Sequence, residues 1–132
     1  MSNKIKILTI DDDQAITSIF KRILMRSGEY DVKEENFSHR AYLTALEYRP
    51  DVVLLDWQMP IMNGAEVAAQ LIEDPDLCNA PIIFVTGFGQ RAAKFGRPCL
   101  EKPVTPAALI ACIESVMKVP PSETEPANAL CA

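Results

Sequence analysis

The sequence has no long apolar run, no excess of positive charge and few residues of the types that bind zinc. No apolar stretch approaches the roughly 18 residues that a membrane-spanning helix needs, so we expect no membrane segment. The formal net charge of −5 argues against a nucleic-acid partner, which would need a basic stripe. Because the amino-terminal residues lack the apolar core of a signal peptide, we expect a cytoplasmic protein.

Four cysteines and one histidine are present, and their spacing does not suggest a metal site. The cysteines are Cys78, Cys99, Cys112 and Cys131. They form no C-x-x-C pair, and His39 is far from all of them in sequence, so a structural zinc site is not expected. In a cytoplasmic protein the expected state of these side chains is the reduced thiol.

What is present is a pattern of alternating strands and helices within one domain of 132 residues. Short branched apolar runs predict strands at residues 4–10, 30–35, 52–56, 82–85 and 99–101. Apolar residues recurring at i, i+3 and i+4 predict helices at residues 14–27, 38–48 and 65–73 and from 106 to the prolines at 120 and 121. Residues 90–94 allow at most two helical turns. Alternation of this kind predicts a doubly wound (βα)5 α/β fold with a parallel sheet and a reduced fourth helix.

Capping residues and apolar faces support these helices. Asp13 or Asp12 is suited to cap the first helix, Ser38 the second and Thr105 the last, and Gly28 suits a left-handed position after the first helix. The first helix is expected to bury Ile16, Ile19, Phe20, Ile23 and Leu24, and the last one Leu109, Cys112, Ile113, Val116 and Met117. Residues 1–118 then make the domain, and 119–132 are expected to be a disordered acidic tail.

Polar residues follow the strands at what should be one edge of the sheet. They are Asp11 and Asp12 after the first strand, Asp56 at the end of the third, Thr86 after the fourth and Lys102 after the fifth. In a parallel sheet these positions meet beyond the carboxyl ends of the strands, where ligands bind. A run of aspartates alone is more often a helix cap, but carboxylates crowded beside a lysine are reasonable if a divalent cation neutralises them.

The chemistry of these five residues is consistent with phosphoryl transfer. An open site with oxygen ligands suits Mg²⁺, and a lysine and a threonine can donate hydrogen bonds to phosphoryl oxygens. A carboxylate can act as the nucleophile and form an aspartyl phosphate. The pattern therefore predicts Mg²⁺-dependent phosphoryl transfer to an aspartate.

Residues 4–118 resemble a response-regulator receiver domain of bacterial two-component signalling. The resemblance rests on I-L-T-I-D-D, V-V-L-L-D-W-Q-M-P-x-M-N-G, I-I-F-V-T-G and L-E-K-P, in this order and spacing. It implies a flavodoxin-like sheet of strand order 2-1-3-4-5 and a cis bond before Pro103. It also implies that the partner is a histidine kinase or a histidine phosphotransfer protein.

The resemblance also implies a role for each residue of the site. Asp56 would accept the phosphoryl group, and Thr86 and Lys102 would hold its oxygens. The Mg²⁺ ligands would be Asp11, Asp12, Asp56 and the backbone carbonyl of Gln58. Such a domain is a phosphoprotein with slow autodephosphorylation, not a turnover enzyme, and without an output domain it would signal by protein–protein contact.

Two departures from the family pattern concern the region before the lysine. Receivers usually carry a tyrosine or phenylalanine three residues before the lysine, where this chain has Cys99. Lys102 also follows Thr86 by only 16 positions, so the fourth helix is expected to be short. The stretch P-I-I-F-V-T-G-F-G resembles the single-domain FAT GUY receivers of alphaproteobacterial phosphorelays, which have a reduced fourth helix.

Two other functions remain open from the sequence alone. In a haloacid-dehalogenase-type phosphatase, Asp11 would be the nucleophile and Asp13 the acid/base, but this leaves Asp56 without a role. The other alternative is a receiver-like binding module that no longer takes phosphate. The complete set of five polar residues argues against that second reading.

Overall fold

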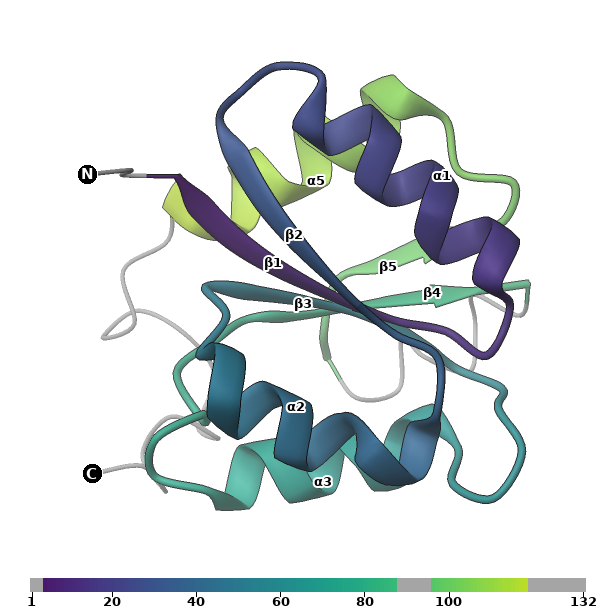
Figure 1. Ribbon diagram of the computed structural model, residues 1–132, viewed down its shortest axis with the longest axis vertical. Coiled ribbons are helices and arrows are strands. Elements are labelled where there is room, and N and C mark those ends of the chain that lie inside the picture. The colour runs from purple at the N-terminus through teal and green to yellow at the C-terminus, as the bar shows by residue number, and fades with distance from the viewer. Residues whose placement is uncertain (1–3, 88–95, 119–132) are drawn as a thin grey trace.

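The computed structural model describes residues 4–87 and 96–118, which contain a five-stranded parallel sheet between two layers of helices (Figure 1). The strands are β1 Ile5–Ile10, β2 Tyr30–Glu35, β3 Val52–Asp56, β4 Ile82–Thr86 and β5 Cys99–Glu101, in the spatial order β2-β1-β3-β4-β5. The helices are α1 Gln14–Met25, the short 3₁₀ helix η1 Ser38–Arg40, α2 Ala41–Tyr48, α3 Gly64–Glu73 and α5 Pro106–Lys118. The predicted fold class and strand order are confirmed.

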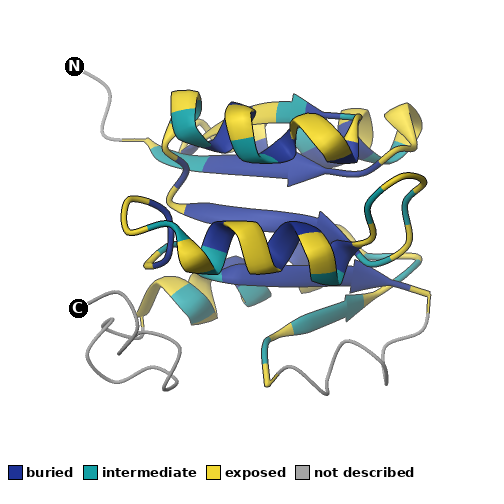
Figure 2. Ribbon diagram, turned by 90° about the horizontal axis from the view of Figure 1, so that it is seen from below, coloured by how far each residue is buried: buried dark blue, intermediate teal, exposed yellow. Residues whose placement is uncertain are grey.

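Each face of the sheet has its own apolar core. Helices α1 and α5 cover one face, packing Phe20, Leu24 and Leu109 against alternate residues of the strands. Helices α2 and α3 cover the other face with Ala45, Val67 and Leu71, among others. Figure 2 shows the consequence, because β3 and β4 are buried along their whole length while the outer sides of the helices are exposed. Strands buried on both faces explain the continuous apolar runs in the sequence.

The predicted strand boundaries agree closely with the structure, because branched apolar runs are short and bounded by polar or proline residues. Strands β2, β3 and β5 have the predicted bounds, β1 begins one residue later and β4 includes Thr86. The bond between Lys102 and Pro103 is cis, as the family resemblance implies. Strand β2 lies at an edge of the sheet, which fits its polar composition.

The predicted caps are partly right. Asp13 caps α1 by accepting a hydrogen bond from the backbone N–H of Ala15, and Thr105 caps α5 by accepting one from Ala108. Gly28 has the expected left-handed φ of 79°. Ser38 was wrongly predicted as a cap, because its hydroxyl instead bonds the loop after β3.

Two residues on the predicted buried faces of helices are exposed. Ile19 of α1 is 49% exposed and Met117 of α5 is 40% exposed. Thr17 of the same helix, which the apolar pattern did not place in the core, is fully buried and hydrogen-bonded to neighbouring polar groups. A hydrophobicity pattern cannot identify such a residue, since a buried hydroxyl is tolerated only when the fold supplies its partners.

Cys78 is disulfide-bonded, which corrects the expectation of reduced thiols throughout, whereas Cys99 and Cys112 are free. Burial raises the pKa of the Cys99 and Cys112 thiols, as expected for unreactive cysteines. The short fourth helix expected at residues 90–94 and the acidic tail at 119–132 lie outside the described residues. None of the described helices has the length and apolar character to span a bilayer.

Candidate functional site

The carboxyl ends of β1, β3 and β5 bring two aspartates and a lysine together. Asp11 follows β1, Asp56 is the last residue of β3, and Lys102 follows β5. The Lys102 ammonium nitrogen lies 3.2 Å from Asp11 Oδ2 and 3.2 Å from Asp56 Oδ1. Residues separated by up to 91 positions in the chain therefore meet at one point, which the strand-end pattern predicted.

Three carboxylates gather at this point, which we call the carboxylate cluster: Asp11, Asp12 and Asp56. One ligand oxygen from each lies within 4.8 Å of the others. Asp11 and Asp56 are only 2% and 4% exposed, whereas Asp12 is exposed. A single lysine cannot balance three such groups, so the cluster carries excess negative charge.

The pKa values of the two buried aspartates are raised because of this environment. Burial raises the pKa of Asp56 to about 7, with the negative charge of Asp11 adding to the effect and Lys102 opposing it. Burial also raises the pKa of Asp11, against the hydrogen bond from Asp13 and the charge of Lys102. Burial lowers the pKa of Lys102, but the two carboxylates more than offset this and leave it raised. The site therefore favours an additional positive charge.

The residues present fit a divalent cation. Asp11 Oδ2 is buried and lacks a hydrogen bond, although Lys102 lies near it. An oxygen-only set with one exposed member suits a hard cation such as Mg²⁺, which keeps part of its water shell. A cation here would satisfy the unused acceptor and neutralise the excess charge of the carboxylate cluster.

Local hydrogen bonds hold Asp11 in place. Its Oδ1 accepts a hydrogen bond from the backbone N–H of Asp13 at 2.9 Å, and its own N–H donates to the carbonyl of Glu35 at 3.1 Å. Asp13 in turn caps α1. The three consecutive aspartates therefore have different roles, because Asp11 and Asp12 belong to the carboxylate cluster while Asp13 caps α1.

Gly64 is a residue of the site that sequence reasoning missed. An added Cβ at Gly64 would lie 2.5 Å from the backbone oxygen of Asp56 and 2.9 Å from Trp57 Cα, so only glycine allows α3 to begin this close to β3. The Gly64 N–H donates to the carbonyl of Trp57 at 2.8 Å. The sequence offered only an Asn-Gly pair, which indicates a turn; the close approach depends on packing across the chain.

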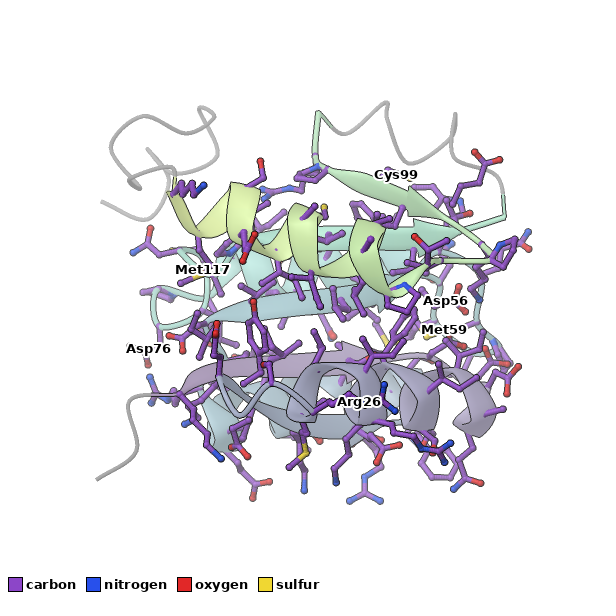
Figure 3. All side chains as sticks on the ribbon, turned by 90° about the horizontal axis from the view of Figure 1, so that it is seen from above. Arg26, Asp56, Met59, Asp76, Cys99 and Met117 are labelled. Carbon is purple, nitrogen blue, oxygen red and sulfur yellow. The ribbon has the colours of Figure 1, made fainter. Side chains whose placement is uncertain are left out.

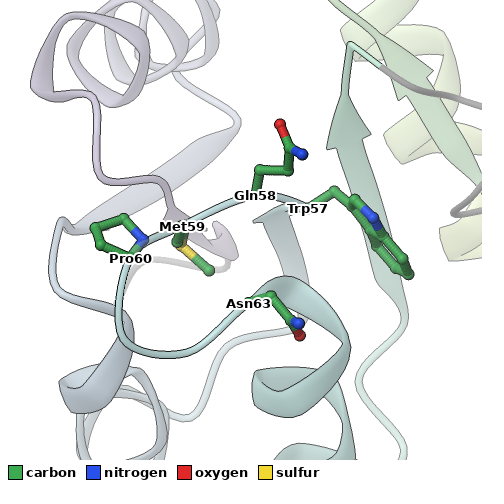
Figure 4. A pocket seen from close by; sticks show the side chains of 5 residues that line it. All are labelled: Trp57, Gln58, Met59, Pro60 and Asn63. Carbon is green, nitrogen blue, oxygen red and sulfur yellow. The ribbon is translucent and has the colours of Figure 1, made fainter.

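The start of α3 is fixed by a capping box. Asn63 accepts a hydrogen bond from the Glu66 backbone, and the Glu66 side chain accepts one from the Asn63 backbone. The loop between Asp56 and this box borders an open pocket, lined by Trp57, Gln58, Met59, Pro60 and Asn63 (Figure 4). Trp57, which lines the pocket, directly follows Asp56 of the carboxylate cluster in the chain.

The remaining predicted residues lie beside the cluster. Thr86 ends β4, where its carbonyl accepts a hydrogen bond from the Lys102 N–H at 2.9 Å, and it is 1% exposed. Its strand neighbour Val85 is the register partner of Asp56. Trp57 is partly buried, with its ring edge-on to Phe84 at 5.1 Å between centroids. An indole this close to Asp56 can report changes at the site.

The arrangement disfavours the phosphatase alternative. That reading needs Asp13 as an acid/base beside Asp11, but Asp13 is exposed, caps α1 and does not belong to the carboxylate cluster. Asp56, which that reading left without a role, is instead a buried member of the cluster.

Comparisons with known proteins agree with this geometry. A chemotaxis protein CheY homolog of Campylobacter jejuni is 33% identical over 119 residues, covering 85% of this chain and 92% of that protein. The phosphate regulon transcriptional regulatory protein PhoB of Pseudomonas aeruginosa is 29% identical over 118 residues. That match covers 85% of this chain but spans about half of PhoB, 51% of its length.

Solved structures share the fold. Chemotaxis protein CheY4 of Vibrio cholerae superposes with a TM-score of 0.76 at 27% identity, covering 86% of this chain and 98% of that one. The receiver domain of a sensor histidine kinase of Pseudomonas aeruginosa superposes with a TM-score of 0.78 at 20% identity, covering 88% of this chain and 99% of that one. That second structure has a magnesium ion coordinated in its active-site cleft.

The family assignment follows from the sequence match over most of the domain. Residues 7–114 match the response regulator receiver domain, from within β1 to within α5. This range contains the whole carboxylate cluster and Lys102. The chain therefore belongs to the response regulator receiver domain family.

Proposed function

We propose that Asp56 accepts a phosphoryl group in a Mg²⁺-dependent reaction, and that the phosphorylated domain signals through contact with another protein. The observation that supports this most directly is the carboxylate cluster with Lys102 at 3.2 Å from two of its members. Asp11, Asp12, Asp56 and the carbonyl of Gln58 would hold the cation. When bound, Mg²⁺ would neutralise charge on the carboxylates and on the incoming phosphoryl oxygens.

In the reaction, an oxygen of Asp56 attacks the phosphorus of a phosphohistidine. The phosphorus–nitrogen bond breaks as the new phosphorus–oxygen bond forms, and the electron pair returns to the imidazole of the donor. Lys102 and Thr86 donate hydrogen bonds to the phosphoryl oxygens. Lys102 already lies against Asp56, so its ammonium group is in position before the phosphoryl group binds.

The donor would be a histidine kinase or a histidine phosphotransfer protein in the cytoplasm. The relatives that match this chain carry chemotaxis and regulatory names, which favours a signalling role over turnover of a small substrate. Replacing the aspartate by an acyl phosphate adds negative charge and oxygen acceptors at a buried position. That change in charge is what a partner protein would detect.

The test is phosphorylation by acetyl phosphate, followed by mass spectrometry of the intact protein. Wild type is expected to gain the mass of one phosphoryl group in the presence of Mg²⁺ and none in EDTA. Asp56→Asn should gain none. Asp51→Asn is the matched control, because Asp51 lies just before the opposite end of the same strand and is exposed; it should react as wild type does.

The two alternative functions predict different results. Wild type that binds Mg²⁺ but takes no phosphoryl group from acetyl phosphate or from a phosphorylated kinase would indicate a phosphate-independent binding module. Turnover of an aryl phosphate that Asp11→Asn abolishes and Asp56→Asn does not would indicate the phosphatase. Either result would overturn the proposal.

A further inference from the structure

The segment that runs from the end of β2 to the first residue of η1 contacts both loops that supply the proposed cation ligands. We call Asn36–Ser38 the brace segment. It follows β2, on the same side of the sheet as the carboxylate cluster, and contacts the loop after β1 on one side and the loop after β3 on the other. None of its residues belongs to the carboxylate cluster, and the sequence analysis gave it no role in the site.

On one side, Asn36 holds the backbone of Asp11. Its side-chain N–H donates to the Asp11 carbonyl at 2.8 Å and to the Thr17 hydroxyl at 3.0 Å. The Thr17 hydroxyl is fully buried and also lies 3.0 Å from a carboxylate oxygen of Glu34. Since the Asp11 N–H is bonded to Glu35, both polar groups of the Asp11 backbone are bonded at the end of β2.

On the other side, Ser38 holds a strained turn in the loop after β3. Its hydroxyl donates to the Pro60 carbonyl at 2.8 Å and accepts from the Met62 N–H at 3.2 Å. The residue between them, Ile61, has a φ of 73°, and Met62 also donates to the Pro60 carbonyl. A β-branched residue in this conformation is unfavourable, so the contacts around it are needed to keep it.

The loop that contains Gln58 is thereby held at two points. At its base, Gly64 donates to the Trp57 carbonyl; further along, Ser38 bonds on both sides of Ile61. The Gln58 carbonyl lies between these points in the chain. The brace segment therefore bonds both the loop that contains Asp11 and the loop that contains Gln58.

We propose that Asn36 and Ser38 are positioning residues that set the spacing between the Asp11–Asp12 loop and the Gln58 loop, and so adapt the site to a cation of the size of Mg²⁺. This inference rests on the proposed function. Mg²⁺ requires near-ideal octahedral ligands at about 2.0–2.1 Å, whereas Ca²⁺ accepts a flexible shell at about 2.3–2.6 Å. Loosening the spacing should weaken Mg²⁺ binding much more than Ca²⁺ binding.

The experiment titrates Mg²⁺ and Ca²⁺ separately into wild type, Asn36→Ala, Ser38→Ala and the double variant, following Trp57 fluorescence. Each single variant is expected to lose about tenfold in Mg²⁺ affinity, as for other residues that orient metal ligands, and clearly less in Ca²⁺ affinity. The double variant should lose little more than either single one, because releasing one side of the brace already frees the spacing.

Tyr48→Phe is the matched control. Tyr48 also takes part in two tertiary hydrogen bonds, but to Asp31 near the start of β2, away from the site. Urea unfolding without metal tests whether each variant is folded. A Mg²⁺-to-Ca²⁺ preference that falls in Asn36→Ala and Ser38→Ala but not in Tyr48→Phe supports the brace.

The opposing outcomes are distinguishable. If wild type binds Mg²⁺ and the variants keep its preference over Ca²⁺, or lose affinity for both ions equally, the brace is wrong and the proposed function stands. If wild type binds no Mg²⁺, both the proposed function and the brace are overturned.

Discussion

The two ends of the sheet carry similar side chains in opposite electrostatic situations. At the amino edge, where the strands begin, Asp51 accepts a hydrogen bond from the Lys6 backbone and Asp31 accepts one from Tyr48. These aspartates are exposed. At the carboxyl edge, where the strands end, Asp11 and Asp56 are buried beside each other. Figure 3 shows Asp56 and Met59 at this end and Asp76 at the other.

The difference shows how burial, rather than composition, makes a site. An exposed carboxylate with one hydrogen bond is solvated by water and contributes little to stability or function. Buried carboxylates close together cost stability unless a cation or a covalent group compensates them. The carboxylates at the carboxyl edge therefore favour binding of a ligand that compensates their charge, whereas those at the amino edge are already solvated by water. Four pairs of substitutions test this contrast.

The largest effect on stability is expected from substitution of Gly64, which is compared with substitution of Gly28. Gly64→Ala should lower the free energy of unfolding by about 3 kcal/mol, because the new Cβ would meet backbone atoms of Asp56 and Trp57 that cannot easily move. Gly28→Ala, near the amino edge, should cost only about 1 kcal/mol, since its φ of 79° is unfavourable but no atom lies within 4 Å of the added Cβ. Urea unfolding measures both. Equal costs would mean that α3 can shift away from β3.

The next effect concerns the lysines. Without metal at pH 8, Lys102→Met should lower the free energy of unfolding by about 2–3 kcal/mol. The substitution removes the ammonium group that pairs with two buried carboxylates. Lys6→Met should cost about 0.5 kcal/mol, since the Lys6 ammonium only lies over the Tyr48 ring, 4.7 Å from its centroid. Saturating Mg²⁺ should restore part of the loss in Lys102→Met. A loss that Mg²⁺ leaves unchanged would contradict an electrostatic cause.

A third pair tests the raised pKa of Asp56. The folded-state pKa is about 7 against an ordinary value of 3.8, so the folded protein binds this proton more tightly than the unfolded chain does. The stability that protonated Asp56 contributes is present below pH 4 and is lost as the pH rises through 7. Without metal, Asp56→Asn should therefore be about 2 kcal/mol more stable than wild type at pH 8 and nearly equal to it at pH 4.

Asp51→Asn is the control for that pH dependence. Its side chain is exposed and accepts one hydrogen bond, which an amide oxygen can also accept. Its stability should follow that of wild type within about 0.5 kcal/mol across the same pH range. A gain at pH 8 in both variants would assign the effect to the overall negative charge rather than to burial at the carboxyl edge.

The smallest difference is expected where both edges use ordinary hydrogen bonds. Asn63→Ala removes the cap of α3 at the carboxyl edge and should cost about 1 kcal/mol. Tyr48→Phe removes hydrogen bonds to Asp31 at the amino edge and should also cost about 1 kcal/mol. Thermal or urea unfolding can compare them. A much larger cost for Asn63→Ala would show that the loop after β3 adds more than a helix cap.

Sequence reasoning succeeded where the signal is local. Apolar runs bounded by polar residues located the strands, and aspartates and a lysine at their ends predicted the cluster before any distance was known. It failed for Ser38, Ile19 and Gly64. Ser38 bonds residues more than 20 positions away, and Gly64 packs against the backbone of Asp56 and Trp57 across a loop. The exposure of Ile19 depends on how α1 is rotated against the sheet. None of these contacts is encoded in a short pattern.

By itself, the sequence determined the alternation of strands and helices and which chemical groups stand at the strand ends, because periodicity and chain order are properties of the chain. Only the tertiary structure decided which of those groups are buried and how close they lie. It also decided that Asn36 and Ser38 bond the two loops beside the site. The reason is physical, since burial and carboxylate spacing, which set the pKa values and the affinity for a cation, exist only once distant segments pack together.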